Sequence, residues 1–145
     1  GSKLLNIKNT DAFYIEASDY LRTSADAEVA TGAKDVWEKV KEIEYKDING
    51  TIRVSFTLRT GGSSSTYAMS AQIYKNGVAY GTLRSRNSGN GGGSTSFSED
   101  LAFETGDLIQ LYHARTGSSG GGSSSAFRIS YDKLVKREES IVNLD

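Results

Sequence analysis

The chain has 145 residues and a mass of 15.6 kDa, the size of one domain that buries about two-thirds of its unfolded surface. It has no cysteine, which excludes disulfides, thiolate metal sites and a cysteine nucleophile. Seventeen basic and 18 acidic residues are mixed along the sequence, so nucleic acid is not expected as a partner. No apolar run is long enough to span a bilayer, so we expect no membrane insertion.

The N-terminal segment has no clean hydrophobic period. Gly1 and Ser2 are typical of a cloning remnant. Residues 3–21 contain apolar side chains without regular spacing, which leaves a strand, a short helix and a connector open. We predict that residues 1–26 form an N-terminal connector and that residues 27–31 form a short strand.

Residues 35–46 give an ambiguous local signal. Val36, Val40 and Ile43 fit a helical stripe, and the charged residues between them favour a helix. The pair Asn49-Gly50 follows, and a turn there would lead back from a strand at residues 51–59 to an antiparallel partner. We predict a strand with a bulge near Glu42 that pairs with residues 51–59, and a helix is the alternative.

The rest of the chain reads as a series of β-strands. Asn76-Gly77 lies between two apolar runs and predicts a hairpin with a type I′ turn. Three Gly/Ser tracts separate strand-like segments that are too short to be domains, so we predict loops rather than linkers. The fold class predicted is all-β, an antiparallel β-sandwich of jelly-roll type over residues 27–134, followed by a C-terminal tail at 135–145. The expected strands are residues 27–31, 51–59, 70–74, 78–84, 95–103, 108–114 and 126–134.

Catalytic patterns are scarce. His113 is the only histidine, the serines lie mainly in Gly/Ser loops, and no nucleophile-elbow pattern occurs. Glu99 and Asp100 are neighbours on an expected strand and should point to opposite faces, unlike the acid pair of a glycosidase. One histidine without cysteine, and no calcium-loop pattern, predict no metal. We therefore expect a protein that is not an enzyme and has no cofactor.

Tyrosines beside the Gly/Ser tracts are the best candidates for ligand contact. The chain has 8 Tyr, 5 Phe and 1 Trp, and exposed aromatic rings stack on sugars or anchor protein interfaces. Phe56 and Phe127 alternate as core residues should. Tyr67, Tyr80 and Tyr112 are expected to be exposed, and we predict them as ligand-binding residues.

Four stretches carry a resemblance to known proteins: residues 50–56, 73–77, 97–101 and 106–112. They resemble modules in tail-tip and prophage structural proteins of phages that infect Gram-positive bacteria. More distantly, they are similar to the jelly-roll heads of the complement C1q and tumour necrosis factor class. The resemblance covers residues 27–134. It implies a β-sandwich displayed at a particle or cell surface, often as a homotrimer, with no catalytic residues.

Two functions follow as expectations. The first is a phage tail or virion surface module that binds a host cell-envelope glycan or another virion protein. The alternative is a carbohydrate-binding domain of a secreted bacterial protein. The expected location is the virion tail or an extracellular surface, and the expected assembly is a homotrimer.

Overall fold

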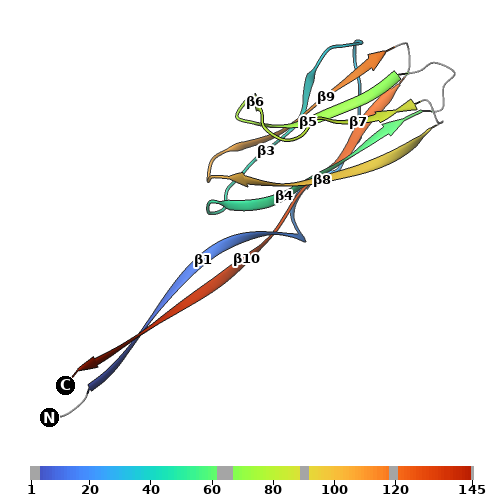
Figure 1. The fold of residues 1–145 in the computed structure, drawn as a ribbon. Coiled ribbons are helices and arrows are strands. Elements are labelled where there is room, and N and C mark those ends of the chain that lie inside the picture. The colour runs from blue at the N-terminus through green and yellow to red at the C-terminus, as the bar shows by residue number, and fades with distance from the viewer. Residues whose placement is uncertain (1–3, 62–66, 89–91, 118–120, 145) are drawn as a thin grey trace.

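The computed structural model describes residues 4–61, 67–88, 92–117 and 121–144, and it shows two antiparallel β-sheets packed face to face (Figure 1). A long two-stranded ribbon extends from this sandwich and contains both chain ends. The predicted all-β sandwich is therefore confirmed. Among the described residues, no helix has the length and apolar character needed to cross a membrane.

The first sheet has the order β1-β10-β4-β8, with β2 beside β10. The β4 and β8 strands pair without interruption from Gly50↔Phe103 to Thr60↔Gly93. This sheet contains β1 (Leu4–Ala25), β2 (Val29–Ala30), β4 (Gly50–Thr60), β8 (Gly93–Phe103) and β10 (Gly122–Leu144).

The second sheet has the order β3-β9-β5-β6, with β7 beside β5. It contains β3 (Glu38–Glu44), β5 (Tyr67–Lys75), β6 (Val78–Ala79), β7 (Arg84–Asn87) and β9 (Leu108–Gly117). The chain changes sheet at every connection from β2 to β5 and at every connection from β7 to β10. These crossings are the connectivity expected of a jelly roll.

The core lies between the sheets because each strand alternates apolar and polar residues. In β4, Ile52, Val54, Phe56 and Leu58 are buried, whereas the residues between them are more accessible. Strand β10 adds buried residues from the same sheet, and β5 and β9 face them from the other sheet. The buried cluster is Ile15, Tyr45, Ile52, Val54, Phe56, Leu58, Met69, Ala71, Ile73, Phe103, Ile109, Leu111, Phe127, Ile129 and Tyr131.

The strand predicted within residues 35–46 is confirmed as β3, with a register irregularity between Lys39 and Lys41. Its predicted partner was wrong, because β3 pairs with β9 and not with β4. The physical reason lies in the connection that follows. Tyr45 is buried and its N–H donates to the carbonyl of Asp107, and Ile48 packs against the core. These contacts carry the chain across the sandwich, so Asn49-Gly50 is not a hairpin turn.

The Asn76-Gly77 turn is confirmed. Asn76 has a φ of 52° and Gly77 a φ of 82°, as a type I′ turn requires at both central positions. The second arm of this hairpin is shorter than predicted. It forms β6 and β7 with a break between them, where the N–H groups of Tyr80 and Gly81 both donate to the carbonyl of Ile73.

The two terminal segments form one element. The expected connector at residues 1–26 is mostly β1, and the expected tail at 135–145 is the far half of β10. These strands pair from Leu4↔Leu144 to Ala17↔Tyr131 and, after register shifts, to Ala25↔Phe127. The predicted boundary at 134 thus falls within β10, whereas the boundary at 26/27 lies in the connection between β1 and β2. Local periodicity did not reveal this because the ribbon has no second sheet over it.

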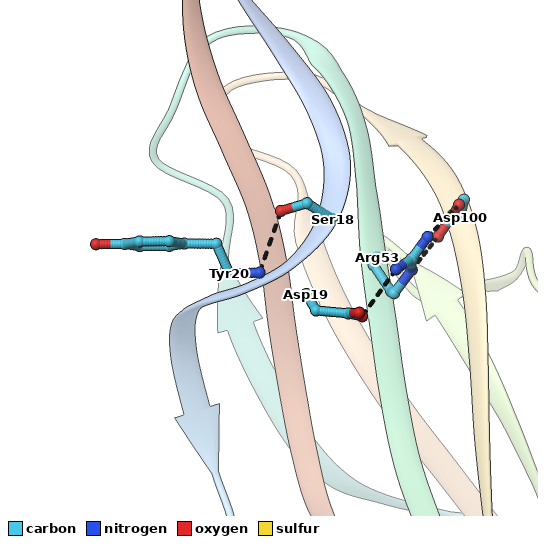
Figure 2. A network of polar contacts seen from close by, with 5 residues as sticks. All are labelled: Ser18, Asp19, Tyr20, Arg53 and Asp100. Atoms are coloured by element: carbon cyan, nitrogen blue, oxygen red, sulfur yellow. Dashed lines mark hydrogen bonds and ion pairs between the residues drawn. The ribbon is translucent and has the colours of Figure 1, made fainter.

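A β-bulge joins the ribbon to the sandwich (Figure 2). Asp19, in the bulge, accepts a hydrogen bond from Arg53 of β4 at 2.8 Å, and Arg53 also donates twice to Asp100 of β8, at 2.9 and 3.2 Å. Strand β10 lies between β1 and β4, with Ser130 opposite both Leu21 and Arg53. The guanidinium of Arg53 therefore links β1, β4 and β8 where the ribbon meets the sheet. These hydrogen bonds favour one direction of the ribbon relative to the sandwich.

The hairpin turn gives a stability prediction. Gly77 has open space around its α-carbon, so Gly77→Ala meets no steric contact and its cost comes from the positive φ. We expect the free energy of unfolding to fall by about 1 kcal/mol. The measurement is urea unfolding. Gly121→Ala is the matched control, because Gly121 also has open space but no positive φ, and its stability should be nearly unchanged. Equal losses in both variants would contradict the assignment of the cost to φ.

Candidate functional site

The three predicted tyrosines lie in three separate places, and Tyr67 is not exposed as expected. It is 2% exposed and lies near the end of β4 and the start of β10. The hydroxyl donates to the carbonyl of Gly121 and accepts the N–H of Gly61 at 2.8 Å. Tyr67 therefore has a structural role through its burial and its hydroxyl contacts. Its ring has no face that a ligand could reach.

Tyr80 is 40% exposed but is held from two sides. Its hydroxyl donates to the carbonyl of Ala102 at 2.8 Å, and its ring packs edge to face on Phe103 with 5.5 Å between centroids. The ammonium of Lys75 lies 4.7 Å from the ring centroid. These contacts fix the segment between β6 and β7 against β8.

Tyr112 lies on the outer face of the second sheet, on β9. Its ring stacks on that of Tyr74, from β5, with 3.9 Å between centroids and 23° between planes. Both side chains are half-buried. Neither hydroxyl has a hydrogen-bond partner among the residues that the structure describes. Sequence reasoning missed Tyr74, although its alternation with the buried Ile73 predicted that it points outward.

A polar network surrounds the Tyr74–Tyr112 stack. The side-chain amide of Gln110 donates to Glu42 at 2.8 Å, and the ammonium of Lys39 donates to the same carboxylate oxygen at 3.0 Å. The amide of Gln72 donates to the carbonyl of Gly81. The hydrogen bond from Gln110 and then that from Lys39 hold the pKa of Glu42 below its ordinary value. The carboxylate is therefore charged at neutral pH and paired with a cation.

A cleft of about 500 Å³ opens between β3 and β10 near the ribbon. Ile43, Ile109 and Ile129 form its apolar part. On its other side, Tyr131 donates from its hydroxyl to Asp47 at 2.9 Å, and Lys133 donates to the other oxygen of that carboxylate at 3.0 Å. The groups that converge in the cleft are thus largely bonded to one another.

Burial shifts the pKa values of the ionisable side chains in this cleft. It raises the pKa of Tyr131 to about 12, with the carboxylate of Asp47 adding to the effect. It raises the pKa of Tyr45 as well. Burial also opposes ionisation of Asp47, but hydrogen bonds from the Ile48 N–H, Lys133 and Tyr131 outweigh it and lower that pKa. At neutral pH both tyrosines stay protonated and donate, so the cluster ties the β3–β4 connection to β10.

His113 lies in the interior of the sandwich. Its Nδ1 is 2.8 Å from the Ser124 hydroxyl, both side chains are fully buried, and Nε2 has no partner in the described part of the chain. A Ser-His-acid triad places the serine at Nε2 and the acid at Nδ1, with the serine accessible to substrate. The His113–Ser124 pair has neither feature. Burial lowers the pKa of His113, so the ring is neutral at pH 7.

The carboxylates show no paired arrangement. Asp100 binds Arg53 on the outer face of the first sheet, whereas Glu99 accepts hydrogen bonds from the N–H and hydroxyl of Thr82. The predicted opposite orientation of Glu99 and Asp100 is confirmed. Within the described residues, no group of three or more His, Cys, Asp or Glu side chains is arranged to hold a metal ion.

No protein-family model and no curated protein matches the chain. Among solved structures, the chain is similar to one in the structure of the infectious bursal disease virus Gx strain, with 16% identity and a TM-score of 0.43. The alignment covers 94% of this chain and 38% of the virus chain, so this chain spans well under half of that protein's length. Similarity at this level assigns no family, and the resemblance to Gram-positive phage tail modules stays a prediction.

The buried histidine gives a pH prediction. Above about pH 6.5 neither state binds a proton at this ring, and below it only the unfolded chain does, because the folded pKa is lowered. The free energy of unfolding should therefore fall by about 1 kcal/mol between pH 7.5 and 5.5. Urea unfolding across this range measures it. His113→Asn should remove the slope, whereas an equally steep slope in that variant would contradict the assignment.

The cleft hydroxyl gives a second prediction. Tyr131→Phe removes a donor to a charged, half-buried carboxylate, and we expect a loss of about 1 kcal/mol in the free energy of unfolding. Tyr112→Phe is the matched control, since that hydroxyl has no partner among the described residues, and its stability should be unchanged. Thermal and urea unfolding of both variants measure the difference. Equal stability of the two would show that the Tyr131–Asp47 bond contributes nothing net.

Proposed function

We propose that the chain is a non-enzymatic surface-display module of a phage tail or virion, which binds a host cell-envelope glycan or a neighbouring virion protein. The observation that supports this most is the ribbon. Both ends of the chain lie at its tip, on the side away from the sandwich (Figure 1). The sandwich is therefore a head at one end of the ribbon, and the ribbon can act as a spacer.

The length of the ribbon suits this role. Ile15 is buried and lies at the base of the head, where Gly50 leaves room for it: a Cβ at Gly50 would lie 2.4 Å from that of Ile15. Beyond Ile15, residues 4–14 pair with β10 outside the sandwich. At a rise of about 3.4 Å per residue this part reaches about 35 Å. A spacer of this length would hold the sandwich away from a surface to which the tip of the ribbon is bound.

The ribbon also supports the proposed homotrimer. Within the described strands, β1 pairs in this region only with β10, and β10 beyond Ser130 pairs only with β1, so both outer edges are open. Phe13 and Val135 are opposite one another and are 58% and 52% exposed. A two-stranded ribbon is marginally stable in water, and open edges with apolar side chains favour association. Contact with identical ribbons would supply the missing partners.

A second candidate is the carbohydrate-binding domain of a secreted bacterial protein. The Tyr74–Tyr112 stack on an outer sheet face is the observation that favours it. Both candidate functions include contact with a glycan. They differ in the role that they give to the ribbon. A domain cut from an enzyme needs only a linker, whereas a display module needs a stalk that assembles.

Changes at the ribbon test the display proposal. The double variant Phe13→Glu, Val135→Glu should convert a trimer into a monomer, because like charges replace the apolar pair, while the head stays folded. Sedimentation equilibrium measures the assembly and circular dichroism the fold. Val78→Glu, at an equally exposed apolar site on the head hairpin, is the control and should stay trimeric.

Binding to purified Gram-positive cell walls is the second readout. The trimer should bind more tightly than the monomeric variant, since linked heads engage the surface together. A wild-type chain that is monomeric at high concentration and does not bind cell walls would contradict the proposal. Turnover of glycan or ester substrates above background would contradict its non-enzymatic part.

A further inference from the structure

The structure points to a neutral-glycan binding face on the outside of the β3-β9-β5 sheet, which we propose as the receptor-contact surface. Its elements are three aromatic side chains, Trp37, Tyr112 and Tyr74, here called the aromatic row. The inference deepens the proposed receptor-binding role and rests on it.

The register places the aromatic row on a diagonal. Tyr74 on β5 is opposite Gln110, and Tyr112 lies two residues further along β9. Lys39 on β3 is opposite Tyr112, and Trp37 precedes Lys39 by two residues. Lys39 is exposed, and Trp37 lies two residues before it and is 40% exposed, which places both on the outer side by the two-residue period of a strand. Each step along the row thus moves one strand across and two residues along.

The fold does not account for these aromatic side chains. The rings of Tyr74 and Tyr112 contact each other outside the core cluster, and their hydroxyls have no partner among the described residues. Trp37, the single tryptophan, lies one residue before β3 and takes no part in that cluster. By contrast, Tyr67 is buried, the ring of Tyr80 packs on Phe103, and both of these hydroxyls donate hydrogen bonds. Aromatic residues without a structural role on one face indicate a surface that recognises something.

The polar residues around the row determine the class of ligand. Lys39 and Glu42 neutralise each other, so the face attracts neither an anion nor a cation. The amides of Gln72 and Gln110 are fixed by hydrogen bonds to Gly81 and Glu42. The second carboxylate oxygen of Glu42 and the two tyrosine hydroxyls can still form hydrogen bonds with a ligand. Aromatic rings between fixed amides and hydroxyls suit a neutral sugar, which presents C–H groups to a ring and hydroxyls to its rim.

The experiment starts with an array of short neutral oligosaccharides of hexose and N-acetylhexosamine units, probed with the full chain. The best hit is then titrated calorimetrically against Trp37→Ala, Tyr74→Ala and Tyr112→Ala. We expect each to weaken binding by about tenfold or more. Tyr20→Ala, at a 60% exposed tyrosine on β1, is the matched control and should bind like the wild type.

A second measurement uses only the wild-type chain, so that the inference can be tested even if one of the variants fails to fold. Amide shifts of the wild-type chain on addition of the hit should change at residues 37–42, 72–74 and 110–112. The absence of any array hit, or shifts confined to another face, would overturn the inference. Wall binding that survives periodate oxidation of the glycans would also overturn it in favour of a protein partner, and would leave the display proposal standing. If the chain binds sugar through Tyr112 but never assembles, the glycan inference would stand and the display proposal would be contradicted.

Discussion

The pairing of β1 with β10 is the constraint on which the rest of the structure depends. These strands are 22 and 23 residues long, and they pair from Leu4↔Leu144 to Ala25↔Phe127. Within the head, this pair forms half of the first sheet and contributes Phe127, Ile129 and Tyr131 to the core. Outside the head it is a two-stranded ribbon. A change that shifts its register by one residue would move those side chains to the wrong face.

Three local devices keep this pair in place. The bulge at Asp19 redirects β1 and is held by Arg53, and Gly50 lets Ile15 approach β4. At the same end of the sandwich, Tyr131 and Lys133 bind Asp47 of the β3–β4 connection. The contacts that direct the ribbon, carry the β3–β4 connection across the sandwich and line the cleft therefore all involve the pair of β1 and β10.

Much of the fold could be predicted from the sequence, because alternation and turn residues act locally. Asn76-Gly77 specifies its turn, and residues 51–59 show the period of a half-buried strand. Strand partners could not be predicted in the same way. The Asn49-Gly50 pair favours a hairpin locally, but burial of Tyr45 against the opposite sheet outweighs that preference. The terminal strands have no consistent period because one part lies in a sandwich and the other in an open ribbon.

The candidate site was less predictable than the fold. Proximity to Gly/Ser tracts suggested that Tyr67 is exposed, yet its hydroxyl anchors those loops from inside. Tyr112 does lie on an outer face, but its neighbours Tyr74 and Trp37 come from other strands. Only the register of β3, β9 and β5 brings the three into one row. Local sequence does not contain that register.

The central claim is that the ribbon is an assembling stalk that holds the head. Hydrogen exchange of the ribbon amides at several protein concentrations tests it most directly. If the stalk assembles, exchange at residues 4–14 and 134–144 slows as concentration rises, while exchange in β4, β5 and β9 stays constant. Ribbon exchange that is independent of concentration and as fast as in an unfolded chain would contradict the account.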